Sequence, residues 1–216
     1  ANTFSVYDTE VMKGSTFELP VYMTNVDGIS AFQCDIYLSS GLQMNYNDEG
    51  DYAFTLNSNR ATSSHTIASE LQADGAIRVI VYSNSSKLFR GNDGELFTLN
   101  LSVSSLLNQS VSIRNIHLST ADEVEYLSAD ITSNITVKTF TPADVDDNGM
   151  VTIVDVVAVV NRLLGNSSGK FVFEAADMDQ NGEITIVDVV AVVNVLLGRN
   201  VQATGARSIL HSDIHV

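Results

Sequence analysis

The chain has 216 residues, of which 26 are acidic and 11 are basic, so its formal net charge at pH 7 is −15. This acidic surplus disfavours nucleic acid and anionic membranes as main partners and favours cations, of which calcium is the first to consider. With 44% hydrophobic residues the chain can fill a core, and its length predicts one or two domains.

Signals for export, membrane insertion and cysteine chemistry are few. No uncharged apolar stretch reaches the roughly 18 residues that a membrane-spanning helix needs. The first residues, Ala1, Asn2 and Thr3, form neither a basic nor an apolar start, so we expect that any secretion signal has been removed. Cys34 is the single cysteine, which excludes a disulfide framework and a cysteine-based metal site.

The first part of the chain alternates hydrophobic and polar residues with a period of two. This pattern runs through residues 16–24, 31–39, 77–82 and 97–103, and it is typical of strands that bury one face. Pro20 lies inside the first run. Because proline cannot donate a ladder hydrogen bond, it predicts that this strand lies at an edge.

A change of phase and a series of turns complete this pattern. In residues 111–118 the alternation changes phase near Arg114 and Asn115, which predicts a β-bulge. Asp-Gly pairs at residues 27–28 and 74–75 predict turns between strands. We see no amphipathic helix pattern here, so the first part is predicted to be a β-sandwich.

The second part of the chain contains an internal repeat. Residues 144–165 and 177–198 are identical at 17 of 22 aligned positions. Each copy begins with a loop rich in Asp, Asn and Gly and continues as an apolar run that ends in Leu-Leu-Gly. The β-branched residues of 153–164 also allow a strand. We favour a helix, because a glycine after the last apolar turn is a helix stop.

The loop of each copy has the spacing of a calcium-binding loop. Such a loop supplies side chains at positions 1, 3, 5 and 12, a main-chain carbonyl at position 7 and a glycine at position 6. The predicted ligands of the first copy are Asp144, Asp146, Asn148, the Met150 carbonyl and Asp155. Those of the second copy are Asp177, Asp179, Asn181, the Glu183 carbonyl and Asp188. We therefore predict two Ca²⁺ ions; the alternative is a pair of turn-rich loops without an ion.

The apolar run of each copy leaves more hydrophobic surface than two packed helices can bury. Residues 153–164 and their counterparts are apolar on nearly every side. Such a surplus predicts an interface with a partner or packing on the neighbouring sandwich, and both interpretations stay open.

These two loops, each with Asp at position 12 and followed by a helix (an F-hand), make residues 141–200 resemble a type I dockerin domain. The resemblance implies a small all-α module that binds two calcium ions and docks onto a cohesin domain. It implies that the partner-binding residues are Ile153, Val154, Asn161, Arg162, Ile186, Val187, Asn194 and Val195. The Ser-Thr pair usual at the tenth and eleventh loop positions is Ile-Val in both copies, which predicts hydrophobic recognition. Near-identity of the copies implies that either helix can dock.

The first part resembles a cohesin-type sandwich, a jelly roll related to carbohydrate-binding modules. The matching stretches are residues 13–42 and 75–103. This resemblance implies a partner-binding sheet face on or near which six outward-pointing residues lie: Gln33, Asp35, Tyr37, Arg78, Ile80 and Tyr82. The alternative is a sheet face that only meets solvent.

The predicted fold class is therefore multi-domain. An all-β jelly-roll sandwich of the cohesin type spans residues 1–139, and an all-α dockerin with its two calcium repeats spans residues 140–200. Residues 201–216 form a C-terminal tail.

The predicted function is non-catalytic. We expect a secreted or cell-surface bacterial assembly protein that binds a cohesin-type or dockerin-type protein, or another copy of itself, in a calcium-dependent way and serves a polysaccharide-degrading complex. A carbohydrate-binding module anchored through a dockerin is the alternative. The absence of Trp weakens that alternative, while seven Tyr leave it open. Neither a Ser-His-Asp order nor a phosphate loop occurs, so no enzyme is expected.

Overall fold

The alternating runs form strands that bury their apolar face. In the strand over residues 16–24, Leu19, Val21 and Met23 are buried, while Pro20 and Tyr22 between them are half-buried. The computed structural model describes residues 1–166 and 169–199. The chain divides into two compact units, Ala1–Thr139 and Phe140–Val216. Residues 1–139 contain strands and turns and no helix.

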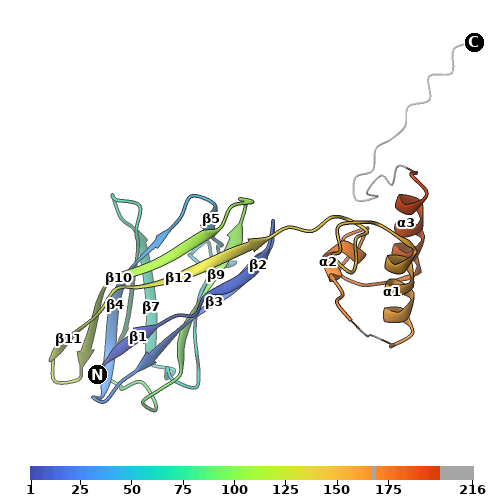
Figure 1. The fold of residues 1–216 in the computed structure, drawn as a ribbon. Helices are drawn as coiled ribbons and strands as arrows, with labels where there is room; N and C mark the ends of the chain where they lie inside the picture. Colours follow the sequence, from blue (N-terminus) through green and yellow to red (C-terminus); the bar gives the residue numbers. More distant parts are fainter. Residues whose placement is uncertain (167–168, 200–216) are drawn as a thin grey trace, which may run out of the picture. The chain divides into compact units, whose positions relative to one another are not determined.

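Two sheets pack against each other in the first unit (Figure 1). The first sheet has the order β1-β3-β9-β5, and β6 also pairs with β9. Its strands are β1 (Thr3–Ser5), β3 (Thr16–Thr24), β5 (Leu42–Met44), β6 (Phe54–Leu56) and β9 (Glu95–Val103). The second sheet has the order β2-β12-β10-β4-β8-β7, and β11 also pairs with β10. Its strands are β2 (Thr9–Met12), β4 (Ile29–Leu38), β7 (His65–Leu71), β8 (Ile77–Ser83), β10 (Gln109–Thr120), β11 (Glu125–Ser128) and β12 (Ile131–Lys138).

The prediction that Pro20 marks an edge strand is correct for part of β3. Pro20 faces Thr98 of β9 on one side, whereas β1 pairs only with Tyr22, Met23 and Thr24 on the other. The proline therefore lies where β3 has a single neighbour, and its missing N–H costs no ladder bond there. β2 pairs with β12 in parallel, and the other strand pairs are antiparallel.

The predicted bulge in β10 is confirmed. The register between β10 and β4 shifts between Arg114 and His117. Asn115 lies inside this step with a φ of 49°, a left-handed conformation that asparagine tolerates better than most residues. The step moves Asn115 out of the alternation and allows Ile113 and Ile116 both to be buried.

The inner faces of the two sheets share one hydrophobic core. The rings of Phe32 on β4 and Phe97 on β9 stack with centroids 5.2 Å apart, so the two sheets meet through aromatic contacts. Cys34 is fully buried among these side chains.

The valine-rich runs of the second unit are helices, which confirms the helix prediction over the strand alternative. They form α1 (Ile153–Leu163) and α3 (Ile186–Leu196), joined by a segment that contains the four-residue α2 (Phe173–Ala176), which was not predicted. Val156 and Val159 of α1 pack with Val189 and Val192 of α3. In the part of the chain that the structure describes, no helix is long and apolar enough to span a bilayer.

Candidate calcium centres and docking surfaces

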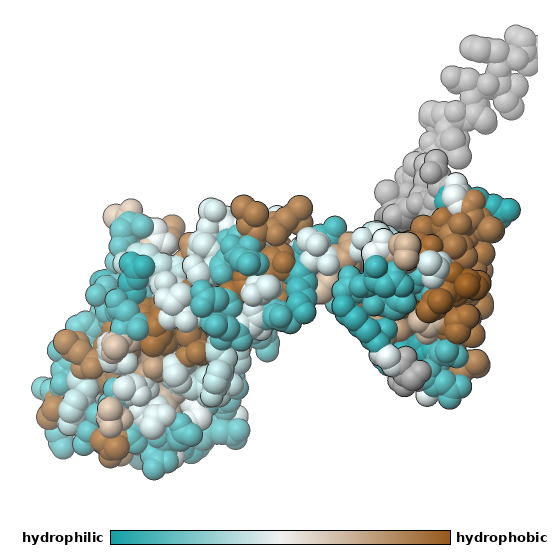
Figure 2. Space-filling model, in the orientation of Figure 1, coloured by the Kyte–Doolittle hydropathy of each residue, from teal (hydrophilic) through white to brown (hydrophobic). Residues whose placement is uncertain are grey.

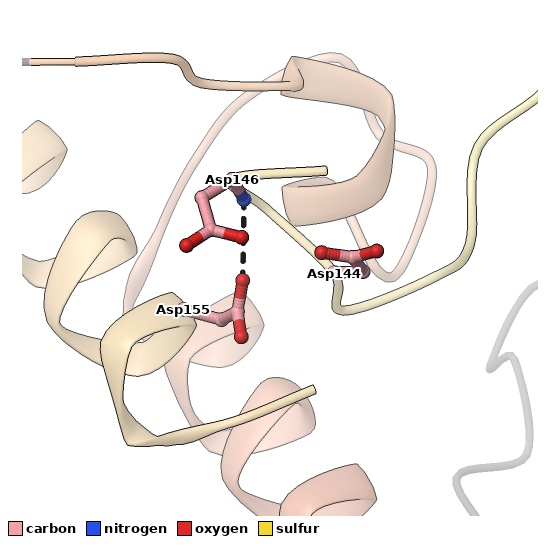
Figure 3. A group of neighbouring side chains, drawn as sticks. All are labelled: Asp144, Asp146 and Asp155. Atoms are coloured by element: carbon pink, nitrogen blue, oxygen red, sulfur yellow. Dashed lines mark hydrogen bonds between the residues drawn. The ribbon is translucent and has the colours of Figure 1, made fainter. Parts of the chain in front are cut away.

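Three aspartates converge at the start of α1. One carboxylate oxygen each from Asp144, Asp146 and Asp155 lies within 4.8 Å of the others (Figure 3). Asp144 and Asp146 come from the loop before the helix, and Asp155 comes from the helix's first turn. The chain thus folds back so that the carboxylates of Asp144 and Asp155, 11 positions apart, lie side by side.

Asp155 holds this arrangement through both of its carboxylate oxygens. Its Oδ1 accepts hydrogen bonds from the backbone N–H of Val145 (2.7 Å) and Asp146 (3.2 Å). Its Oδ2 accepts one from the N–H of Thr152 (2.7 Å), while the Thr152 hydroxyl accepts one from the N–H of Val154 (3.1 Å). This is a capping box, so the residue that closes the loop also begins the helix.

The turn of the loop is built around Asp144. Its oxygens accept hydrogen bonds from the N–H groups of Asn148 (3.1 Å) and Gly149 (2.9 Å). Gly149 has a φ of +91°, a conformation that a side chain would strain. The Asn148 amide group donates to Asp146 (2.9 Å). The Met150 side chain points into solvent, so the carbonyl is the group that Met150 can offer to an ion.

The second copy repeats this geometry. Oxygens of Asp177, Asp179 and Asp188 lie within 4.8 Å of one another. Asp188 accepts hydrogen bonds from the N–H groups of Met178 (2.8 Å) and Thr185 (2.8 Å) and caps α3 as Asp155 caps α1. Asn181 and Glu183 occupy the places of Asn148 and Met150.

The electrostatics of both loops fit a bound cation. Asp144, Asp155, Asp177 and Asp188 are buried, with at most 8% of each exposed. Within the described part of this unit, none of these four forms an ion pair; Lys170 pairs instead with the outer Asp147 of the first loop. A buried carboxylate needs a positive partner, and a hard divalent ion with oxygen ligands supplies one. The residues present therefore fit Ca²⁺.

A hydrophobic surface covers one side of the helices in the second unit (Figure 2). We call it the helix face. Its members are apolar side chains that are at least half exposed: Ile153, Val154, Val157, Ile186, Val187 and Val190. Of the other implied partner-binding residues, Arg162 is exposed and its guanidinium lies 5.5 Å from the Phe171 ring, while Asn161, Asn194 and Val195 are half-buried.

The second sheet of the first unit presents an outer face formed by β10, β4, β8 and β7, which we call the sheet face. Gln33, Tyr37, Arg78, Ile80 and Tyr82 lie on it, in alternation with buried neighbours. A hollow of about 360 Å³ lies on the β10 side of Ile80, and one of about 400 Å³ lies toward β7. Ile80 lines both and therefore lies between them.

Asp35 lies on the same outer face as expected, but neighbouring side chains cover it, so it is not accessible to a partner. It is only 2% exposed, and Arg78 donates two hydrogen bonds to its carboxylate at 2.7 and 2.9 Å. Asn115, placed by the bulge, donates a third at 2.9 Å. The bond from Arg78 lowers the pKa of Asp35. Sequence analysis missed the role of Asn115, although the change of phase was its signal.

Comparison with known families assigns both units. The family model of the cohesin domain matches residues 3–139. The chain belongs to the cohesin family. C-terminal to this cohesin domain in the sequence, the family model of the type I dockerin domain matches residues 142–197. Cohesins and dockerins are non-catalytic interaction modules and cover nearly the whole chain, which is thus an assembly protein of the cohesin–dockerin type. No curated protein matches the chain.

Solved cohesins share the fold of the first unit at low sequence identity. The sixth cohesin of scaffoldin B from Acetivibrio cellulolyticus, solved with a Cel5 dockerin, has a TM-score of 0.53 at 17% identity and covers 64% of this chain and 99% of its own. A cohesin module of a family 33 glycoside hydrolase from Clostridium perfringens has a TM-score of 0.52 at 13% identity, covering 64% of this chain and 98% of its own. The seventh ScaB type I cohesin from Pseudobacteroides cellulosolvens has a TM-score of 0.51 at 15% identity, covering 66% and 96%.

Proposed function

We propose that the chain is a secreted or cell-surface bacterial adaptor with two docking surfaces. The sheet face of its cohesin domain binds the dockerin of one protein, and the helix face of its dockerin binds the cohesin of another. The observation that carries this proposal is the exposed Ile-Val pair at the start of both helices, together with the two hollows on the sheet face. A polysaccharide-degrading complex is the setting that we propose for it.

We propose further that two calcium ions hold the dockerin in its binding form. Oxygens of Asp144, Asp146, Asn148, Asp155 and the Met150 carbonyl would hold one ion, and the corresponding groups of the second loop would hold the other. The working dockerin would then comprise residues 140–200, and the predicted tail, residues 201–216, lies outside the described residues. Calcium supports binding by fixing the loops from which both helices start.

Recognition by the helix face would be hydrophobic. Ile153 and Val154, and equally Ile186 and Val187, offer branched apolar side chains where the two copies are identical. Either helix can then present the same surface to a cohesin. At the far end of the helices, Arg162 of the first copy corresponds to Val195 of the second, so this position distinguishes the two orientations.

The test uses the full chain and two surface variants. A panel of cohesins and dockerins is titrated by calorimetry in calcium. We expect I80D to abolish dockerin binding and leave cohesin binding intact, and V154D/V187D to do the opposite. V26D, which places the same charge at an exposed apolar residue outside both faces, serves as the control.

Two results would contradict the proposal. If the chain binds no member of the panel, neither the sheet face nor the helix face is a docking surface. Binding of cello- or xylo-oligosaccharides by the first unit in place of dockerins would favour the carbohydrate-binding function instead.

A further inference from the structure

A short hairpin stands beside the sheet face and is held rigidly. Asn45 and Ala53 are joined by a backbone hydrogen bond of 2.8 Å, and so are Asn47 and Asp51. The Asn47 side-chain oxygen accepts hydrogen bonds from the N–H groups of Glu49 (3.0 Å) and Asp51 (2.9 Å), which fixes the turn. The rings of Tyr46 and Tyr52 stack across the hairpin with centroids 5.2 Å apart.

A hollow of about 340 Å³ lies between this hairpin and β7. Its walls are aromatic and aliphatic, from Tyr52, Phe54, Ile67 and Ala68. Its polar lining consists of Asn47, Glu49, Asp51 and Ser69, and it contains no basic side chain. The hollow thus combines a hydrophobic wall with two carboxylates.

This combination fits the side chain of lysine or arginine. Aromatic rings attract a cation through their π-face, carboxylates pair with it, and the long aliphatic stem packs on apolar walls. An anion would be repelled. A neutral sugar would find a ring and hydrogen-bond acceptors, but it would gain nothing from two negative charges.

The hollow adjoins the sheet face at the edge of β7. Ala68 and Ser69 line it and also line the second hollow of the sheet face, which Ile80 separates from the first. Ala68 pairs with Ile80 and shares its face, whereas Ile67 and Ser69 pair with the buried Val81 and Val79, so the hairpin hollow opens around the edge of β7. Because neighbouring strands lie about 4.8 Å apart, a docked helix that crosses Ile80 and continues for about ten residues, or about 15 Å, extends past β7, the strand that lines the hairpin hollow.

We infer that the docking surface of the cohesin domain extends over the edge of β7, and that the hairpin hollow receives a lysine or arginine side chain from the end of the docked dockerin helix. This inference rests on the proposed function of the sheet face. The hollow adds a site for a positive charge to this surface, and it selects dockerins with a basic residue at that end of the helix.

The test of the hollow uses a probe that needs no partner protein. The full chain is titrated with Nα-acetyl-lysine methylamide and followed by two-dimensional amide NMR, with the uncharged norleucine analogue as the control ligand. We expect saturable shifts in residues 45–53 and at Ala68 and Ser69 with the lysine probe alone. E49Q or D51N should weaken binding about tenfold, since each removes a charged hydrogen-bond partner.

D48N is the matched control variant. Asp48 belongs to the same turn and carries the same charge, but it does not line the hollow. We expect D48N to bind the probe nearly as well as the wild type. Three results would each overturn the inference. They are an equal loss of probe affinity in D48N and E49Q, equal amide shifts with the norleucine analogue, and saturable binding of cellobiose in place of the lysine probe.

A second measurement separates this inference from the proposed function. With a dockerin whose binding I80D abolishes, E49Q should lower affinity about tenfold and D48N should not. If I80D abolishes binding and E49Q leaves it unchanged, the proposed function stands and the extended surface is wrong. If the chain binds no dockerin, the proposed function fails, and the extended surface fails with it even where the lysine probe binds.

Discussion

At the scale of single residues, one buried charge on the sheet face, that of Asp35, stands out. Asp35 lies on the same strand face as Gln33 and Tyr37, yet Arg78 and Asn115 saturate its carboxylate. A carboxylate held in this way gives the sheet face a fixed position for the Arg78 guanidinium, whose side chain is 38% exposed. On our proposal, Asp35 acts on docking by positioning Arg78 rather than by touching a partner.

Replacing Asp35 should destabilise the first unit in a pH-dependent way. We expect D35A to lower the free energy of unfolding by about 3 kcal/mol at neutral pH, because it leaves Arg78 and Asn115 without their acceptor. The folded pKa of Asp35 is lowered, so its stabilisation is fully present above the unfolded value of about 3.9 and is lost as pH falls further.

Urea unfolding followed by tyrosine fluorescence measures this effect, because all seven tyrosines lie in residues 1–139. D35N serves as the control, since it keeps one acceptor oxygen and does not titrate. If D35N and the wild type lose the same unfolding free energy below about pH 4, the acid sensitivity comes from groups other than Asp35.

Cys34 should be chemically inert in the folded protein. Its side chain is fully buried, and burial, together with the neighbouring Asp35, raises the pKa of the thiol. A thiol that stays protonated and covered is a poor nucleophile. Iodoacetamide should leave the native chain unmodified and alkylate it fully in denaturant, as read by mass spectrometry. Fast alkylation under native conditions would mean that the core opens locally.

At the scale of elements, one residue in each repeat both begins a helix and closes a loop. T152A removes the hydroxyl that caps α1 but none of the loop's carboxylates, so it should cost about 1 kcal/mol of stability and leave two calcium ions bound. D155A removes the shared carboxylate and should leave one ion bound. Calorimetric titration counts the ions, and circular dichroism gives the stability of the helices. Loss of an ion in T152A would show that the cap and the ion site cannot be separated.

Long periodic elements could be predicted from the sequence, whereas short elements and individual contacts could not. The alternation in β3, β4, β8 and β9 and the repeat that forms α1 and α3 extend over enough residues for a pattern to be visible. The four-residue α2 and the three-residue β5 and β6 offer too few residues for a periodicity. The burial of Asp35 depends on Asn115, which is 80 positions away and reaches it only because β10 lies beside β4.

At the scale of the whole molecule, the two units depend on different forces and should respond separately to a chelator. The sandwich has a large hydrophobic core, whereas the second unit has a small core and, on our proposal, two ions. One ion at a hundred times its dissociation constant contributes about 2.7 kcal/mol, which is decisive for a domain of this size. We therefore expect EGTA to unfold the second unit and leave the first intact.

The two units also carry separate optical signals. In the described chain, helices occur only in the second unit and tyrosines only in the first, so circular dichroism and tyrosine fluorescence report on them independently. Loss of the helical signal in EGTA with an unchanged tyrosine signal is the expected result. Magnesium in place of calcium serves as the control ion. Helices that persist in excess chelator would contradict the proposed role of the ions.

The place of β12 has a consequence for mechanical load. The strand ends at Lys138, close to where the second unit begins at Phe140, and it lies between β2 and β10. A tether under tension at residue 140 pulls β12 lengthwise, while its ladder bonds to both neighbours run across that direction. The hydrogen bonds are therefore loaded in shear and must break together, not one after another. This loading geometry makes the end of the sandwich at β12 resistant to mechanical unfolding.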